Sequence, residues 1–336
     1  MDVISVGIVI ADCVARPVGR VPAAGELELV DEIGLFLGGS AANTGIALAR
    51  LGLRVALVGQ LGRDGFGDFL EGAARAAGCD TRFLRRGEVP TSATLVNVDA
   101  AGERSFLHAV GAGARLRAAD VPLAGLAAEG ARALHVAGYF VLPGLEPDLP
   151  GLFGQATELG LLTSLDTVWD ATGRWPRVHA ALPHTDVFCP SLPEARHITG
   201  CSEPGDVLDA LLGLGVRRVA AVKMGPQGAL IGRPDGTRLH LSAAPVRAVD
   251  GTGAGDAFIG GLLAGLLRDE GLEAAGRLGS AAGALCVGAM GATAGLQGLA
   301  PTRALADTLR ADVLRRGGLH PGGPQPDEHG PPGGTP

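Results

Sequence analysis

Residues 250–258 read Asp-Gly-Thr-Gly-Ala-Gly-Asp-Ala-Phe and lead directly into an apolar stretch, Ile259 to Leu267. The apolar stretch predicts a buried helix, and the small residues before it let a ligand approach the backbone closely. Free amides of the first helical turn, together with about half a positive charge from the helix dipole, favour an anion there. The segment therefore predicts an anion-binding helix start that needs no lysine.

Asp256 falls in the first turn of this predicted helix. The helix dipole favours a carboxylate at this position, so we expect Asp256 to be ionised at neutral pH. Next to a bound phosphate, an ionised carboxylate can accept the proton of an attacking hydroxyl group. The structural alternative is that Asp256 only caps a glycine-rich turn.

Outward from this segment, short apolar runs alternate with helical patterns. The runs are Val3 to Ile10, Val55 to Val58, Ala133 to Ala137, Leu161 to Leu165, Val187 to Cys189 and Val219 to Val222. The helical patterns are Ala41 to Leu51, Phe66 to Ala77, Glu194 to Thr199 and Val207 to Leu214, each followed by a glycine that signals a helix end. This alternation predicts an α/β fold with a mostly parallel sheet and helices on both faces.

Some segments break the alternation. Glu26 to Val30 alternates polar and apolar residues, and Ser92 to Val98 pairs with Glu103 to His108 in a predicted hairpin. Half-buried strands do not belong inside a parallel core, so we expect a small separate sheet, inserted at about 12–34 and 91–109, that acts as a lid. A further hairpin, Ala229 to Arg233 with Thr237 to Leu241, is expected at an edge of the main sheet.

Two segments early in the chain offer groups for a hydroxyl-bearing ligand. In Gly38-Gly39-Ser40-Ala41-Ala42-Asn43-Thr44, two glycines run into a helix, Ser40 is a suitable N-cap, and the Asn43 amide lies in the first turn. Asp12 follows the first predicted strand, and ligands of open parallel sheets bind outside the carboxyl ends of the strands. An ordinary capped helix and a solvated loop aspartate are the structural alternatives.

Lys223 is the only lysine of the chain and ends a predicted buried strand before the turn Gly225-Pro226-Gln227-Gly228. It is a candidate for contact with a nucleotide phosphate. A surface lysine in an arginine-rich chain is the alternative interpretation.

The early and late glycine-rich segments, in this order, resemble the two signatures of the ribokinase-like (PfkB) carbohydrate kinases. Segments between them resemble that family too: Gly62-Arg63-Asp64-Gly65-Phe66-Gly67, Gly102-Glu103-Arg104-Ser105-Phe106, Pro190-Ser191-Leu192-Pro193-Glu194-Ala195 and Val222-Lys223-Met224-Gly225. The resemblance covers about Val3 to Pro301 and implies a three-layer α/β fold with a β-sheet lid. It also implies ATP and Mg²⁺ as cofactors.

The resemblance assigns roles to individual residues. It implies that Asp256 is the catalytic base and that the amides of Gly253, Ala254 and Gly255 form an anion hole. The other implied contacts are Asp12, Gly39 and Asn43 for the substrate, Lys223, Gly225 and Gly228 for ATP, Glu194 indirectly for Mg²⁺, and Asp250 and Thr252 for a monovalent cation such as K⁺.

Three positions depart from the family pattern. Ser191 stands where asparagine is usual, which puts the Mg²⁺–phosphate network in doubt, and Gly251 stands where threonine is common, which leaves cation dependence open. Ser40 replaces a lysine of ribokinase, which argues against ribose as the acceptor. We therefore expect ATP-dependent phosphorylation of a primary hydroxyl on a small sugar or sugar acid.

Composition narrows the classes of function. The formal net charge is −7, so no basic surface attracts nucleic acid, and five cysteines without a CxxC pair indicate reduced thiols in the cytoplasm. No export signal is expected at the N-terminus, and Leu278 to Pro301 is too weakly apolar for a membrane span. Residues 1–315 are expected to form the kinase domain and residues 316–336, rich in Gly and Pro, a disordered tail.

Two alternatives stay open: a nucleoside kinase of the same family, and a sugar- or nucleotide-binding regulator without catalysis. A nicotinamide-dependent dehydrogenase is disfavoured, because Ile-Ala-Asp-Cys follows the first strand where GxGxxG would be needed. The exposed edges of the predicted lid favour a homodimer.

Overall fold

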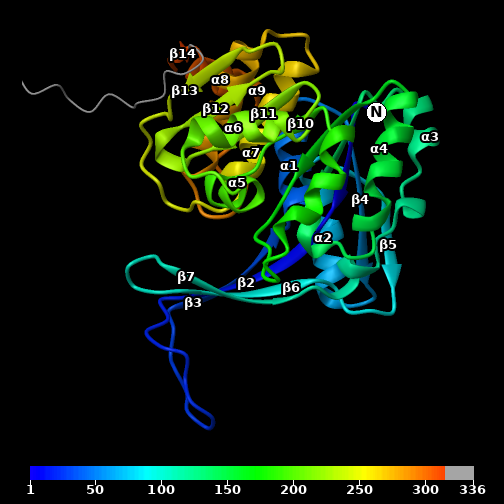
Figure 1. Ribbon diagram of the computed structural model, residues 1–336. Helices are drawn as coiled ribbons and strands as arrows, with labels where there is room; N and C mark the ends of the chain where they lie inside the picture. Colours follow the sequence, from blue (N-terminus) through cyan, green and yellow to red (C-terminus); the bar gives the residue numbers. More distant parts are fainter. Residues whose placement is uncertain (315–336) are drawn as a thin grey trace, which may run out of the picture.

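A computed structural model describes residues 1–314 of the chain (Figure 1). The strands are β1 Val3–Gly7, β2 Ile10–Arg16, β3 Glu32–Gly38, β4 Val55–Gly62, β5 Asp80–Gly87, β6 Ala93–Val98, β7 Arg104–Ala109, β8 Ala133–Ala137, β9 Leu162–Asp166, β10 Val187–Phe188, β11 Val219–Lys223, β12 Ala229–Gly232, β13 Arg238–Leu241 and β14 Ala311–Val313. The α-helices are α1 Ser40–Arg50, α2 Gly65–Ala76, α3 Leu123–Ala128, α4 Leu149–Glu158, α5 Leu192–Thr199, α6 Pro204–Gly213, α7 Ala254–Leu266, α8 Leu272–Cys286 and α9 Leu299–Ala306.

The main sheet has the order β14-β13-β12-β11-β10-β9-β8-β1-β4-β5 among the described residues. The strands from β11 to β5 pair in parallel, whereas β12, β13 and β14 extend the sheet in antiparallel fashion. Parallel strands expose their carboxyl ends along one edge of the sheet, where the connections to the next helices begin.

The sheet lies between two layers of helices, as predicted. One hydrophobic cluster packs α1, α2, α7, α8 and α9 on one face, and a second packs α3, α4, α5 and α6 on the other. Residues of β1 alternate between them, with Val3 in the first cluster and Ile4 and Val6 in the second. The continuous apolar runs of the sequence are therefore strands buried on both faces.

The second sheet, with the order β3-β2-β6-β7, is the predicted lid. It extends away from the main body (Figure 1), and its β6–β7 hairpin follows the predicted boundaries within one residue at each end. One face of the lid, with Asp12, Thr94 and His108 in register, lines a cavity against the body.

Two strand predictions in this region are wrong. The run from Val3 to Ile10 is not one strand, because β1 ends at Gly7 and Ile10 starts β2, where it pairs with Gly38 in the lid. Glu26 to Val30 forms no strand: β2 and β3 pair only as far as Arg16 and Glu32, and Pro17 has no amide hydrogen to continue the ladder. The alternation of apolar and polar residues in a sequence does not show which strand a given backbone segment pairs with.

The remaining predictions concern the last third of the chain. The Ala229–Leu241 hairpin is present as β12 and β13 but is not at the edge, because β14 pairs with β13. Within Leu278 to Pro301, α8 is a largely buried helix that ends at Cys286 and is followed by a loop. No helix among residues 1–314 is long and apolar enough to cross a membrane. The predicted tail, 316–336, lies outside the described residues.

Candidate active site

The two glycine-rich helix starts meet at the centre of the site. Helix α1 packs beside α7, and Asn43 Nδ2 donates a hydrogen bond of 2.8 Å to Asp256 Oδ2. The neighbouring Thr44 hydroxyl donates to the Asp256 carbonyl oxygen at 3.3 Å. Asn43 and Asp256, predicted from separate motifs, therefore form one unit.

Asp256 does not have the lowered pKa that a helix start alone would give it. Burial of the carboxylate raises its pKa, and the hydrogen bond from Asn43 and the positive charge of Lys223 offset this only in part. Burial opposes the helix dipole because it takes the carboxylate out of water. That Asp256 is ionised at neutral pH stays a prediction. A carboxylate with a raised pKa is a stronger base than an ordinary aspartate.

The turn before α7 takes a conformation that requires glycine. Gly253 is the N-cap of α7 at φ 74°, and a Cβ there would lie 2.1 Å from the Ala292 carbonyl oxygen. The Ala254 amide points back to the Gly251 oxygen at 3.4 Å, a long contact. At Gly255, a Cβ would come within 3.2 Å of Lys223 Nζ, so the missing side chain brings a lysine to the predicted anion hole.

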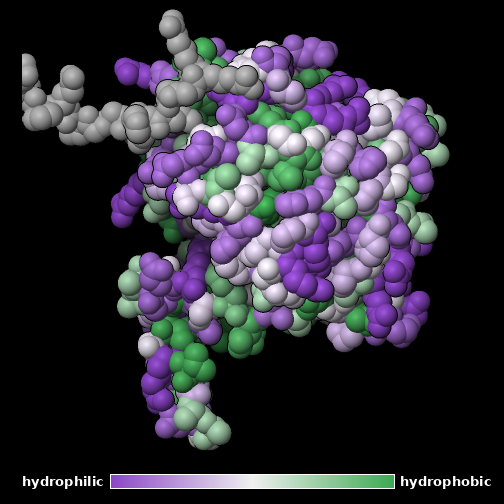
Figure 2. Space-filling view, viewed as in Figure 1, coloured by the Kyte–Doolittle hydropathy of each residue, from purple (hydrophilic) through white to green (hydrophobic). Residues whose placement is uncertain are grey.

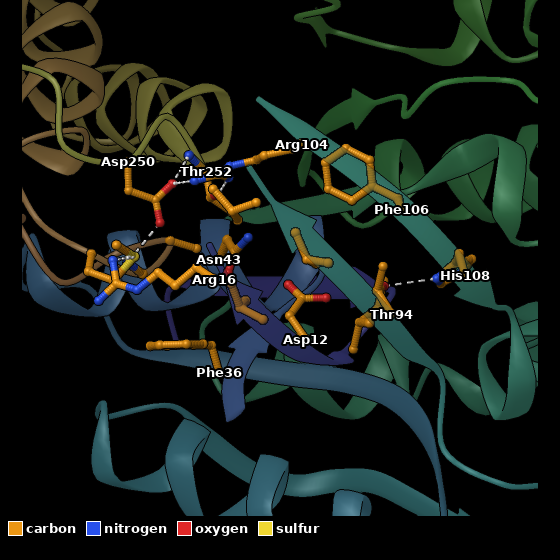
Figure 3. Close-up of a pocket in the computed structure, with 18 of the residues that line it drawn as sticks. Asp12, Arg16, Phe36, Asn43, Thr94, Arg104, Phe106, His108, Asp250 and Thr252 are labelled. Atoms are coloured by element: carbon orange, nitrogen blue, oxygen red, sulfur yellow. Dashed lines mark hydrogen bonds and ion pairs between the residues drawn. The ribbon is translucent and has the colours of Figure 1, made fainter. Parts of the chain in front are cut away.

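Asp12 lies within β2 of the lid, which corrects its predicted position after a strand of the main sheet. Figure 3 shows the Asp12 side chain among the residues that line the cavity. A Cβ at Gly38 of β3 would stand 2.0 Å from Asp12 Oδ2. Burial raises the pKa of Asp12 to about 6, against the opposing influence of the Thr94 hydroxyl and of Arg104. The first glycine of the early motif thus makes room for this carboxylate.

Helix α1 begins one residue earlier than predicted. Its N-cap is Gly39, without a side-chain cap, and Ser40 is the first helical residue. Ser40 was therefore wrongly assigned as the cap. Ser40 instead lines both cavities of the site together with Asp256 and opposes the rise in the pKa of that carboxylate.

Lys223 ends β11 and forms a largely buried ion pair with Asp166, the last residue of β9, with Nζ 3.0 Å from Asp166 Oδ1. Burial alone would lower the pKa of Lys223, but the carboxylates of Asp166, Glu194 and Asp256 outweigh it and raise the pKa. Burial raises the pKa of Asp166 to about 7 in spite of Lys223. The lysine is a charged group of the site and not a surface residue.

Glu194 lies in the first turn of α5 and joins a capping box with Ser191. Its Oε2 accepts hydrogen bonds from the Ser191 amide at 2.8 Å and from the Thr167 hydroxyl at 3.3 Å. Serine is a good N-cap residue, so Ser191 holds Glu194 in place although the family pattern usually has asparagine at this position. No cluster of three or more His, Cys, Asp or Glu side chains in residues 1–314 could hold a metal ion.

Two cavities meet at Asp256. The lid cavity, about 1400 Å³, lies between the lid and the body and is lined by Asp12, Asn43 and Arg104 among others. The strand-end cavity, about 940 Å³, is lined by Lys223, Gly225, Gly228 and Glu194 among others. Residues that line both cavities are Ser40, Val168, Trp169, Gly253 and Asp256. The site therefore has two compartments with one carboxylate between them.

Asp250 and Thr252 lie at the border of the lid cavity (Figure 3) and are bound by Arg104 from the lid. The Arg104 guanidinium donates to the Asp250 carboxylate and to the Thr252 hydroxyl. Asp250 Oδ1 also accepts from the Thr252 amide at 2.8 Å, and Oδ2 from the Gly291 amide at 3.0 Å. Burial would raise the pKa of Asp250, but these hydrogen bonds hold it below the ordinary value.

Sequence reasoning missed several groups of the site. Phe36 and Thr94 line the lid cavity without any motif to indicate them, and Asp166 lines the strand-end cavity. Phe106 and Trp169 also line the lid cavity, and these residues are 61% and 55% exposed. Asp166 follows a predicted strand, so its position at a strand end was the one available signal.

The fold and the two-compartment site define a ribokinase-like kinase. The family model described as "pfkB family carbohydrate kinase" matches residues 1–298, and the chain belongs to this family of kinases. It is 33% identical to aminoimidazole riboside kinase of Salmonella typhimurium, over 77% of this chain and 84% of that protein. It is 32% identical to a fructokinase of Klebsiella pneumoniae, over 68% of this chain and 76% of that protein.

Among solved structures, a putative ribokinase II from E. coli in complex with ATP and Mg²⁺ superimposes with a TM-score of 0.79 at 24% identity. The match covers 91% of this chain and 99% of that one. The predicted three-layer ribokinase-like fold is confirmed.

Proposed function

We propose that this kinase transfers the γ-phosphoryl group of ATP to a primary hydroxyl of a small sugar or sugar acid, with Asp256 as the general base. The observation that carries the proposal is the position of Asp256, held by Asn43 at 2.8 Å, where the lid cavity and the strand-end cavity meet. A base at such a border can face an acceptor on one side and a phosphoryl donor on the other.

The acceptor binds in the lid cavity in this proposal. Asp12 accepts hydrogen bonds from its hydroxyls, Gly39 contributes backbone, and Asn43 both contacts the acceptor and positions Asp256. The Asp256 carboxylate takes the proton of the attacking hydroxyl, and its raised pKa favours this transfer. The lid excludes water, which limits hydrolysis of ATP.

ATP binds in the strand-end cavity, with Lys223, Gly225 and Gly228 as contacts. The amides of Gly253, Ala254 and Gly255 lie at the start of α7 and receive the transferring phosphoryl group as an anion hole. Lys223 Nζ adds a positive charge beside Gly255. Mg²⁺ fits as a partner of ATP, because the site offers single carboxylates such as Glu194 and no ready-made cluster. When bound, it neutralises phosphate charge.

A panel of sugars, sugar acids and nucleosides, each with ATP and read by ADP release, tests the proposal. Turnover of a sugar or sugar acid that Asp256→Asn lowers by about 10² to 10⁴-fold is the expected result. ATP binding without turnover of any acceptor would contradict it and favour the non-catalytic regulator.

A nucleoside-like acceptor is the second candidate, and one observation favours it. Phe36, Phe106 and Trp169 line the lid cavity, whose volume of about 1400 Å³ exceeds the need of a monosaccharide. Exposed aromatic rings can stack on a heterocyclic base. One relative, at 33% identity, is an aminoimidazole riboside kinase. Ribosides in the panel separate this candidate from the first.

We further propose that two copies associate through the outer face of the lid. Cys13, Leu35, Leu95 and Leu107 are in register on this face, opposite Asp12 and Thr94. Leu95 and Leu107 are 54% and 64% exposed, and Figure 2 shows further apolar residues on the β2–β3 connection. A contiguous exposed apolar sheet face fits a two-fold partner. Sedimentation of the Leu95→Lys variant tests the dimer. The Leu159→Lys variant, which changes an exposed residue of the body, is the control.

Residues 1–315 form the kinase domain in this proposal. The cytoplasm is the expected compartment, supported by five free cysteine thiols. The monovalent cation expected near Asp250 and Thr252 is not part of the proposed function, because the groups that would bind it are already engaged by Arg104.

A further inference from the structure

Arg104 crosses from the lid to the body. It is the first residue of β7, next to the tip of the β6–β7 hairpin, and 146 residues separate it from Asp250. Its guanidinium bridges the Asp250 carboxylate and the Thr252 hydroxyl (Figure 3), and the Asp250 side chain is only 6% exposed. The positively charged Arg104 side chain of the lid therefore holds the turn that precedes the predicted anion hole.

The oxygen atoms around this turn do not fit a free monovalent cation. Both Asp250 oxygens accept backbone amides, from Thr252 and Gly291, and the carboxylate charge is balanced by Arg104. The carbonyl oxygens of Thr252 and Ala292 lie 3.4 and 2.8 Å from Cys286 Sγ, whose single hydrogen can be donated to one of them at a time. With the Arg104 guanidinium in place, the Asp250 carboxylate has no unbalanced negative charge for a second cation, and removal of Arg104 would restore that charge.

We propose that Arg104 takes the place of a monovalent cation and holds the Asp250–Thr252 turn in position for the anion hole when the lid is closed. Arg104 is then a positioning residue that acts through the turn. The inference rests on the proposed kinase function. It adds that activity needs no K⁺. It also adds that the Asp250–Thr252 turn becomes ordered in the same step in which the lid closes.

The physical reason is the cost of an unpaired buried carboxylate. When the lid opens, Asp250 loses its counter-charge and the turn loses the Thr252 contact, so the open state is penalised. Arg16, also from the lid, contacts neither Asp250 nor Thr252 in the structure. Arg16 reaches Met290 Sδ at 3.9 Å but its guanidinium is paired with Glu32.

The test measures ADP release by the full chain in potassium chloride and in choline chloride. The wild type is expected to have the same kcat in both salts within twofold. Arg104→Ala is expected to lose at least tenfold in kcat in choline, and K⁺ or guanidinium ion is expected to restore part of it. Arg20→Gln, which removes an exposed arginine from the β2–β3 connection, serves as the matched control and should behave as wild type.

Three results would overturn the inference: tenfold activation of the wild type by K⁺, full kcat of Arg104→Ala in choline, or a loss that neither cation restores. The last result would assign Arg104 to direct substrate contact. If Arg104→Ala does not fold, Arg104→Lys keeps the charge but cannot bridge both partners, and an intermediate kcat without K⁺ activation is expected. Wild-type kcat for this variant would contradict the need for the bridge.

Thermal unfolding gives a readout that does not depend on turnover. K⁺ is expected to raise the melting temperature of Arg104→Ala by roughly 2 °C and to leave the wild type unchanged, because only the variant has an unpaired Asp250. An equal shift in both proteins would overturn the inference. If no acceptor is phosphorylated, the proposed function fails, while this measurement still decides the role of Arg104.

Discussion

The Asn43 amide donates to the Asp256 carboxylate at 2.8 Å, although 213 residues separate the two side chains. This contact brings the start of α1 and the start of α7 into one site. It positions a carboxylate at the border of two cavities, and the following predictions depend on that position.

Asp256→Asn should lower kcat by about 10² to 10⁴-fold, the usual contribution of a general base. The amide is close in size to the carboxylate, so the ATP dissociation constant should change little. Steady-state kinetics and equilibrium ATP binding measure the two effects. Near-normal turnover of this variant would show that another group is the base.

The activity should fall on the acid side at a higher pH than for an ordinary aspartate. Burial raises the pKa of Asp256, so its basic form is lost as the pH falls through that raised value. A pH profile of kcat checks this, with unfolding followed in parallel to exclude acid denaturation. An acid limb at or below the ordinary aspartate pKa of 3.8 would contradict it.

Asp12→Asn should raise the acceptor KM by about 10 to 100-fold, because hydrogen bonds to a charged acceptor are the stronger ones. The ATP KM serves as the internal control and should not change. In the wild type, the acceptor KM should rise as the pH falls below about 6, the value to which burial raises the pKa of Asp12. An acceptor KM that stays constant between about pH 5 and about pH 8, a range that spans this pKa, would count against the role of Asp12.

Gly253→Ala should destabilise the protein by about 2 kcal/mol and reduce kcat, because alanine is disfavoured at positive φ. The new Cβ would also meet the Ala292 carbonyl oxygen at 2.1 Å. Gly251→Ala is the matched control, since a Cβ there has no atom within 4 Å. Chemical denaturation and kinetics of the pair measure the difference, and equal behaviour of both variants would refute the special role of Gly253.

Lys223→Met should lower both stability and ATP affinity. Removal of the lysine leaves Asp166 buried without a partner, which should lower the free energy of unfolding by about 3 kcal/mol. This loss is limited because Asp166 can take up a proton and become neutral. The double variant with Asp166→Asn should regain stability but not ATP binding. Recovery of ATP binding in the double variant would mean that Lys223 acts only as a structural partner of Asp166.

Local chemistry made much of the site predictable. The helix at Ile259 to Leu267, the glycine ends of four other helices and the β6–β7 hairpin follow from residue spacing and turn residues, which act over a few positions. Asp256 and Asn43 were predictable because each lies in the first turn after small residues. The family resemblance then joined the two segments before any geometry was known.

Other features depend on which segments meet in space. Pairing of Ile10 with Gly38 ends β1 early and places Asp12 in the lid, and no periodicity in the sequence specifies that pairing. The raised pKa of Asp256 and the pairing of Lys223 with Asp166 arise from burial by distant segments. The same holds for the reach of Arg104 across to Asp250.

The amino-acid sequence by itself therefore determined the kind of fold, the glycine ends of its helices and the residue types of the site, because backbone propensities, glycine turns and apolar patterns are local. The tertiary structure alone decided which charges are buried, which are paired and where the two cavities meet. Solvation and Coulomb interactions depend on distances through space, and these are set only when the whole chain has packed.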